Sequence, residues 1–274
     1  MPDIDRMAED ARSGTSKRAA PRGRRDGPPV VLLRLGFLAG VLALWHAAAL
    51  AAPPGLFAGP GATAQALLRL MAEGRLPRAL GQSLTVYLVG TSTAVVVGIA
   101  LGAAMGTVRW IGATLDVYVH ALAATPRVAF IPLVILLLGL GVEAKALVVF
   151  MGAVMPVILN AYAGVRAADP DLIEMARATG AGEGRILAHV VLPGALPFLL
   201  AGVRIGATIG LINTVVAELY TAVSGLGGLL ALYASRFQMA EYLAVVVCLA
   251  LIGVAMTEGL RLAERRLLRW RGEA

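Results

Sequence analysis

The chain is poor in charged residues. They occupy 15% of its 274 positions, compared with about 25% in soluble domains. Hydrophobic residues make up 58% of the sequence, and the mean hydropathy is +0.79. These values exclude an ordinary soluble enzyme and predict a membrane protein that crosses the bilayer several times as one domain.

The chain also lacks the residues that build disulfide frameworks and metal sites. Its one cysteine, Cys248, lies in an apolar run, so no disulfide and no cysteine metal site can form within one chain. The three histidines, His46, His120 and His189, are far apart in sequence and have no partner at ligand spacing. We therefore expect no metal and no cofactor on this chain.

Only two lysines are present, and neither belongs to a phosphate-binding loop. Such a loop needs a lysine directly after glycine, whereas Lys17 follows Ser16 and Lys145 follows Ala144. The hydrolase motifs G-x-S-x-G and H-E-x-x-H are absent from the sequence, as is a pair of intramembrane aspartates. We therefore predict that the chain is not an enzyme, and that another polypeptide or an ion gradient supplies its energy.

Long apolar segments are the main feature that is present. A spanning helix needs about 20 apolar residues, and the sequence predicts an all-α, polytopic helical bundle with about six such spans. We place them at residues 30–52, 84–108, 116–140, 144–165, 194–219 and 242–262. The third is interrupted by Pro126, Arg127 and Pro132. Turns on the outer side are predicted at residues 53–54, 139–141 and 224–228.

The distribution of basic residues predicts the topology. Residues 1–29 lack the apolar side chains for a core and are expected to form a disordered cytoplasmic tail, followed by a transmembrane domain over 30–270. With the N-terminus in the cytoplasm, 17 of the 24 Lys and Arg lie on the cytoplasmic side, among them Arg127. Five lie outside, including Lys145, and Arg34 and Arg204 lie within spans. Both termini are therefore predicted to be cytoplasmic, and the basic charge is not read as nucleic-acid binding.

Glycines recur every fourth residue in two of the predicted spans. Small residues at this spacing share one helix face and allow a second helix to approach closely. They can serve packing within the bundle, or they can line a subunit interface or a pathway. The six glycines are Gly98, Gly102, Gly106, Gly202, Gly206 and Gly210.

Residues 167–193 form a polar island between two apolar segments. Asp169 can cap a helix, Pro170 suits its first turn, and Gly180 permits a left-handed stop. The predicted helix has about ten residues, and a second helix over about 183–191 is expected to end at Pro193. A helix this short needs a docking surface, either its own bundle or a partner. One face of the first helix is predicted to carry Leu172, Met175, Ala176 and Thr179.

The island resembles the signature loop of binding-protein-dependent ABC importer permeases. That loop has Glu-Ala-Ala, three residues, Gly, nine residues, an apolar residue, one residue and Leu-Pro. Here Glu174-Met175-Ala176 is followed at the same spacing by Gly180, Val190 and Leu192-Pro193. The departures are Met175 in place of alanine and Val190 in place of isoleucine. Residues 124–133 and 216–227 are similar to the nitrate, sulfonate and taurine importer branch.

The resemblance implies a type I ABC importer permease fold in a bacterial inner membrane. The loop would be a coupling helix, shaped by Glu174, Met175, Ala176 and Gly180, with Leu192 and Pro193 fixing its return to the membrane. The implied partners are a second permease copy, ABC ATPase subunits that carry ATP and Mg, and an extracytoplasmic solute-binding protein. The alternative from the residues alone is an ion-gradient-driven secondary transporter or a channel, which favours broken helices in both halves of the chain.

Two charges within the fifth span need partners, because unpaired charges are costly in lipid. Arg204 and Glu218 are fourteen residues apart, or about 21 Å along one helix, so they cannot pair with each other. Arg204 suits either an anion pathway or a structural ion pair. Glu258 in the sixth span is expected to reach the membrane surface or to pair with Arg261.

Overall fold

The computed structural model describes residues 30–53 and 55–268, and all regular secondary structure in this part of the chain is helical. The predicted all-α class is confirmed. The tail that we expect to be disordered, residues 1–29, lies outside the described residues, as do the last six residues of the chain. Five described helices are long and apolar enough to cross a membrane, and a bent pair makes a sixth span.

Helix α2 (Val30–Ala51) corresponds to the predicted first span. Apart from Arg34 and His46, its 22 residues are apolar on all sides, and almost all of its described side chains are exposed. A helix that is hydrophobic all round suits the lipid interior. The helix up to Ala47 belongs to a first unit, and its last turn belongs to a second unit that begins at Ala48.

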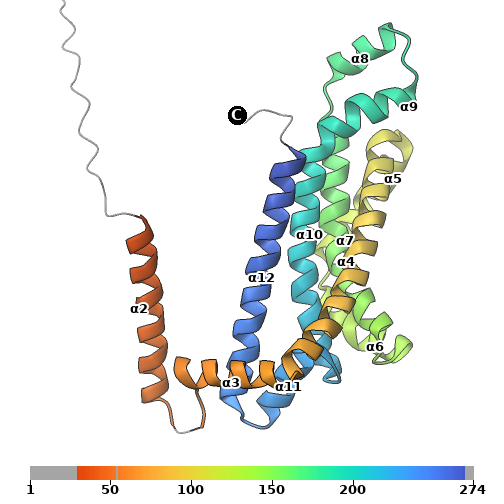
Figure 1. The fold of residues 1–274 in the computed structure, drawn as a ribbon. Helices are drawn as coiled ribbons and strands as arrows, with labels where there is room; N and C mark the ends of the chain where they lie inside the picture. The colour runs from red at the N-terminus through yellow and green to blue at the C-terminus, as the bar shows by residue number, and fades with distance from the viewer. Residues whose placement is uncertain (1–29, 54, 269–274) are drawn as a thin grey trace, which may run out of the picture. The chain divides into compact units, whose positions relative to one another are not determined.

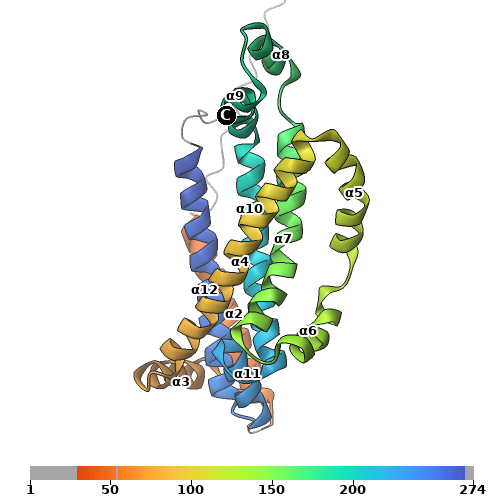
Figure 2. The ribbon, with the colours of Figure 1, turned by 90° about the vertical axis from the view of Figure 1, so that its right-hand side faces the viewer.

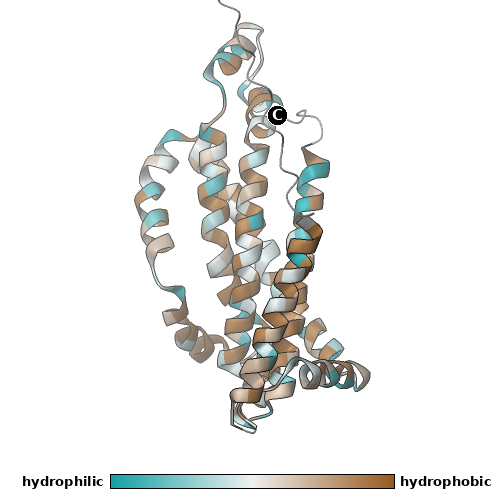
Figure 3. Ribbon diagram, turned by 90° about the vertical axis from the view of Figure 1, so that its left-hand side faces the viewer, coloured by the Kyte–Doolittle hydropathy of each residue, from teal (hydrophilic) through white to brown (hydrophobic). Residues whose placement is uncertain are grey.

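Three long helices make up the centre of that second unit (Figure 1). Helix α7 (Val142–Arg166) packs against both α4 (Arg75–Thr107) and α10 (Leu192–Thr221). Helix α12 (Met239–Leu267) runs alongside α10 (Figure 1). Apolar residues predominate along most of α12, and polar ones gather near its C-terminal end (Figure 3). The second, fourth, fifth and sixth predicted spans are confirmed, although the second begins at Arg75 instead of residue 84.

The periodic glycines pack these central helices together. A Cβ on Gly102 would lie 2.5 Å from the carbonyl oxygen of Ile158 in α7, and one on Gly98 would lie 2.7 Å from Val157. On α10, Gly202 and Gly206 approach the same helix equally closely. The interpretation as packing within the bundle is therefore confirmed for these contacts.

The third span is broken into two helices that meet at 84° (Figure 2). Helix α5 (Arg109–Ala124) ends at Thr125, whose extended backbone is the conformation favoured before proline. The short 3-10 helix η1 (Arg127–Phe130) then leads into α6 (Ile131–Leu138). The span thus starts seven residues before the predicted position 116.

Arg127 does not lie in a cytoplasmic loop, and that prediction is wrong. It occupies the break between α5 and α6, where its guanidinium group donates to the carbonyl oxygens of Gly152 and Ala123 at 3.2 and 3.0 Å. Gly152 is ten residues into α7, about 15 Å from the start of that helix. Arg127 is therefore at mid-height along α7, with its side chain partly buried.

Two short helices lie at the end of the unit opposite α8 (Figure 1). Helix α3 (Pro60–Ala72) was not predicted, and α11 (Gly225–Ser235) occupies a segment predicted as a turn. They belong to one hydrophobic cluster that includes Leu70, Leu76, Leu226, Leu230 and Tyr233. Packing against the long helices stabilises elements that are too short to be stable alone.

Candidate functional site

The polar island folds as predicted at its first helix, α8 (Pro170–Ala178). The Asp169 carboxylate accepts the backbone N–H of Asp171 at 2.9 Å, and Pro170 follows directly at the first helical position. Capping by an aspartate satisfies one of the free N–H groups at a helix start. Helix α8 projects beyond the ends of the long helices (Figures 1 and 2).

Gly180 ends α8 through a Schellman motif. Its φ angle is +82°, in the left-handed region that glycine adopts without strain. The Ala181 N–H donates to the Ala176 carbonyl oxygen at 3.0 Å, and the Gly180 N–H donates to the Arg177 carbonyl oxygen at 2.9 Å. These two hydrogen bonds define the motif, so the predicted role of Gly180 as the helix stop is confirmed.

The apolar residues of α8 are divided between two directions. Ile173 and Ala176 face the bundle and pack against a cluster that includes Val165 and Ile186. Leu172 and Met175 point away, with 46% and 59% of their surface exposed. The predicted face of Leu172, Met175 and Ala176 follows from the helical spacing of α8, and the structure adds that Ala176 lies at its edge, where it packs against the bundle.

An ion pair joins the two helices of the island. Arg177 in α8 lies 3.0 Å from the carboxylate of Glu183, the first residue of α9 (Glu183–Ile186). The hydrogen bond to Glu183 raises the pKa of Arg177 above its ordinary value. Both side chains are largely exposed, so solvent screens this contact and its main effect is on loop geometry.

The chain returns to the membrane through a continuous helical path, in contrast to the predicted end at Pro193. Helix α9 passes into a π-helical turn, η2 (Leu187–Val191), and then into α10. The Leu192 N–H donates to the carbonyl oxygen of Leu187, five residues earlier in the chain. This wider turn accommodates Pro193, which lacks an N–H group and occupies the first turn of α10.

At the opposite end of the unit, side chains from two long helices cap the start of α11. The Gly225 N–H donates to Gln82, the Leu226 N–H donates to the Ser83 hydroxyl at 2.8 Å, and the Gly227 N–H donates to the Glu218 carboxylate at 2.9 Å. Ser83 also donates to Glu218 at 2.8 Å. Glu218 is fully buried, and its Oε2 accepts both hydrogen bonds, whereas its Oε1 has no hydrogen-bond partner among the described residues.

Lys145 contributes a positive charge to the same region. It lies in the first turn of α7 with 2% of its surface exposed, and it donates to the Ser224 hydroxyl at 2.7 Å. Its charge is attracted by the Glu218 carboxylate. The prediction that placed Lys145 in an outer loop is wrong, because the lysine is buried beside Glu218.

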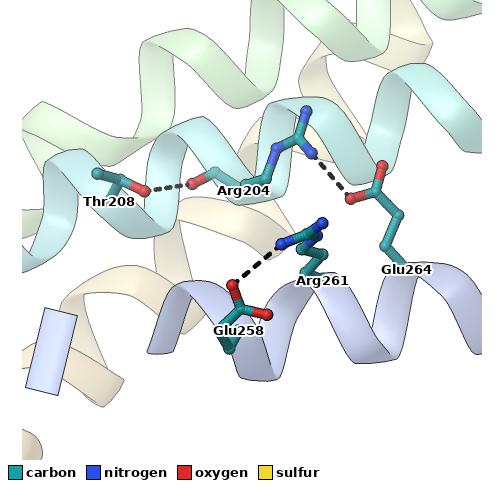
Figure 4. Close-up of polar contacts among 5 residues, drawn as sticks. All are labelled: Arg204, Thr208, Glu258, Arg261 and Glu264. Carbon is teal, nitrogen blue, oxygen red and sulfur yellow. Dashed lines mark hydrogen bonds and ion pairs between the residues drawn. The ribbon is translucent and has the colours of Figure 1, made fainter. Parts of the chain in front are cut away.

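Arg204 and Glu258 find partners towards the C-terminal end of α12 (Figure 4). The Arg204 guanidinium lies 3.0 Å from the Glu264 carboxylate, and Arg261 lies 3.1 Å from Glu258. The pairing expected for Glu258 is confirmed. The contact of Arg204 is of the kind expected for a structural ion pair between α10 and α12.

Comparison with known proteins bears on the polar island and the helical bundle together. The family described as "Binding-protein-dependent transport system inner membrane component" matches residues 94–269, which include the island and all helices from α5 onwards. The chain belongs to this family.

Relatives of this permease support the assignment along nearly the whole chain. It is 32% identical over 255 residues to the taurine transport system permease protein TauC of Escherichia coli, covering 89% of this chain and 91% of the relative. It is 38% identical over 163 residues to the putative aliphatic sulfonates transport permease protein SsuC of the same organism, covering 59% and 62%. A structure of the MetNI methionine ABC transporter has the same fold, with a TM-score of 0.60 at 20% identity over 72% of this chain and 96% of that one.

The permease is thus the membrane subunit of an ABC importer with the type I fold, and it is not itself the ATPase. A member of this family works with a separate ATPase chain and with a solute-binding protein. The motif that identified it from sequence, Glu174 through Pro193, lies in one exposed loop.

Sequence reasoning misplaced two charges, the buried Lys145 and the half-buried Arg127. The available signal was their distance from other basic residues. Cations that set topology cluster near the ends of spans, whereas no other Lys or Arg lies near either of these two in the sequence.

Proposed function

We propose that this permease imports a small sulfonate, such as taurine, or a related anion, such as nitrate, and that α8 couples the transport path to a separate ATPase. The exposed apolar pair Leu172 and Met175 carries the coupling part of the proposal. Their own bundle leaves them uncovered, although exposed apolar surface next to a polar loop is characteristic of an interaction site.

The remaining loop residues have distinct places in this coupling mechanism. Glu174 is exposed beside Met175, while Ala176 anchors α8 to the bundle and Gly180 fixes its end. Leu192 and Pro193 connect the loop to α10 without a break in the helix. A force on α8 would therefore pass into the full length of α10, which packs against α7 and α4.

The partners follow from the same argument. We propose that two copies of the permease enclose the pathway, that both termini and α8 lie in the cytoplasm, and that ATP and Mg bind only to the ATPase subunits. The distribution of Lys and Arg supports this orientation. The names of TauC and SsuC support a sulfonate cargo.

The coupling proposal is tested by placing a charge on the exposed stripe. The permease with Leu172→Asp and Met175→Asp is co-expressed with its ATPase, and co-purification and solute uptake are measured. We expect the permease to insert normally but to lose about tenfold or more of its ATPase association, as is common when interface anchor residues are removed. The matched control is Ala188→Asp, the same change at an exposed position of η2.

Two outcomes would contradict the proposal. Undiminished co-purification of the double variant would show that α8 is not the ATPase contact. A tag at Glu174 that is accessible only from the outside of the cell would place the loop on the wrong side for any cytoplasmic ATPase. The purified permease alone is expected to hydrolyse no ATP.

A further inference from the structure

The break in the third span holds a positive charge that no carboxylate neutralises. Within residues 30–53 and 55–268, Arg127 forms no ion pair, and its hydrogen bonds go only to backbone carbonyl oxygens of Gly152 and Ala123. Its Nε–H is buried with no acceptor. By contrast, Arg204 has Glu264 as a partner, and Lys145 is attracted by Glu218.

A second polar side chain lies against the same glycine. A Cβ on Gly152 would overlap the carboxamide group of Asn213 in α10, so Asn213 packs directly onto the residue whose carbonyl oxygen accepts from Arg127. Among the described residues, no hydrogen bond involves the Asn213 carboxamide. Arg127 and Asn213 thus bring unused N–H donors from two elements to one position on α7.

A layer of buried apolar residues lies next to this position in the bundle. Ile131 of α6, Val148 of α7 and Ala217 of α10 belong to one buried cluster. Gly152 and Asn213 are each four residues, or one helical turn, from Val148 and Ala217 on the side towards α8, and Arg127 precedes Ile131 by four residues across the junction of η1 and α6. A polar site therefore stands directly behind an apolar layer, about 15 Å from the start of α7.

We propose that Arg127 and Asn213 form the site at which the permease receives the anionic group of its cargo. The inference rests on the proposed import of a small anion and assigns recognition of the negative charge to these two side chains. A guanidinium group presents several N–H donors in one plane, a geometry that matches the oxygen atoms of a sulfonate, and the carboxamide N–H₂ adds a neutral donor. An ionisable residue at this depth is costly without a functional partner.

Opening of the site requires a movement that the fold can provide. The Nε–H is closed off in this structure, and the bent span contacts α7 through α5, η1 and α6, each far less extensively than α4 or α10 does. A shift of the bent span away from α7 would release Arg127 from Gly152 and turn its donors towards a bound anion. The apolar layer of Ile131, Val148 and Ala217 would separate that anion from the far side.

Uptake by the assembled transporter tests the assignment. The permease is reconstituted with its ATPase and binding protein, and uptake of taurine and methanesulfonate is measured for Arg127→Gln, Arg127→Lys and Asn213→Leu. We expect Arg127→Gln to lower uptake about tenfold or more, the effect of losing a charge-assisted hydrogen bond. Arg127→Lys should retain part of the activity because it keeps the charge, and Asn213→Leu should lose less than Arg127→Gln. Arg78→Gln, at an exposed position of α4, serves as the control and should transport normally.

A binding measurement separates recognition of charge from a structural role. The melting temperature of the purified complex should rise with methanesulfonate but not with uncharged dimethyl sulfone, and Arg127→Gln should abolish the rise. Wild-type uptake by Arg127→Gln would overturn the inference. Equal losses for Arg127→Lys and Arg127→Gln would also overturn it, because they would indicate that Arg127 serves only to hold η1 against α7. If the wild-type complex itself transports no anion, the proposed function fails first, and the two failures are thereby distinguished.

Discussion

The carboxylate of Glu218 accepts the backbone N–H of Gly227 at 2.9 Å, so a side chain of α10 caps the first turn of α11. A negative charge is favourable at this end of a helix, where the free N–H groups and the helix dipole are positive. Ser83 of α4 binds both the Leu226 N–H and Glu218. The short helix α11 is therefore held by two long helices.

Removal of the Glu218 carboxylate is expected to destabilise the permease. Glu218→Ala leaves the buried Gly227 N–H and the Ser83 hydroxyl without their acceptor, at a cost of about 1–3 kcal/mol for each group. The melting temperature of the purified protein in detergent measures the effect. Glu143→Ala, at an exposed glutamate in the first turn of α7, should leave it unchanged, and an equal loss in both variants would contradict the capping role.

Gly225 should tolerate no side chain. It has a φ angle of +83°, and a Cβ there would overlap the Glu218 carboxylate. Gly225→Ala is expected to cost at least about 1–2 kcal/mol from the backbone alone, with a further loss from the displaced carboxylate. The control is Gly228→Ala, whose Cβ would lie 3.5 Å from the nearest atom. Equal melting temperatures for the two variants would show that the contact with Glu218 is unimportant.

The sequence was sufficient for α8 because its signals are local. Asp169, Pro170 and Gly180 define the two ends of the helix within a dozen residues, and no distant contact overrides them. Helix α11 was missed for the opposite reason. Its start is rich in glycine, which predicts a turn, and the groups that cap it, Ser83 and Glu218, are far away in sequence.

The two candidate sites likewise differ in whether a local pattern reveals them. The spacing from Glu174 to Pro193 identified the exposed loop, since all positions of that motif lie within one short stretch of the sequence. The place of Arg127 beside Gly152 depends on how the bent span meets α7, which no local pattern encodes. Pro126 predicted an interruption but could not show that the span continues past it at 84°.

The close approach of α4 and α7 should depend on Gly102. Its Cβ position lies 2.5 Å from the Ile158 carbonyl oxygen and 2.6 Å from the Ala161 side chain, so Gly102→Ala must push two backbones apart, at about 1–3 kcal/mol. The control is Gly81→Ala in the same helix, where open space surrounds the glycine and alanine favours the helix by about 1 kcal/mol. We expect the melting temperature to fall for Gly102→Ala and to hold or rise for Gly81→Ala. A fall for Gly81→Ala alone would refute the packing argument.

Arg204 and Glu264 offer a direct test of a structural pair against a pathway charge. Because Arg204 is nearly half exposed, solvent screening limits the stability of the pair to about 1 kcal/mol or less. Arg204→Glu alone brings two carboxylates together and should lower the melting temperature, whereas Arg204→Glu with Glu264→Arg should restore both stability and uptake. If the double variant regains stability but not uptake, Arg204 contributes its charge to the pathway.

Gly180 should be required for coupling but not for membrane insertion. A Cβ at this position would meet no atom within 4 Å. An L-residue at φ +82° nevertheless costs about 1–2 kcal/mol, and in Gly180→Trp the indole would lie on the exposed loop that is proposed to bind the ATPase. We expect normal expression with uptake lost relative to ATP hydrolysis, measured as solute transported per ATP in proteoliposomes.

Gly180→Asn, which tolerates the left-handed region, should retain more coupling than Gly180→Trp. Gly184→Ala, in open space without a positive φ angle, should behave as wild type, and normal uptake by a well-expressed Gly180→Trp permease would argue against α8 as the coupling element.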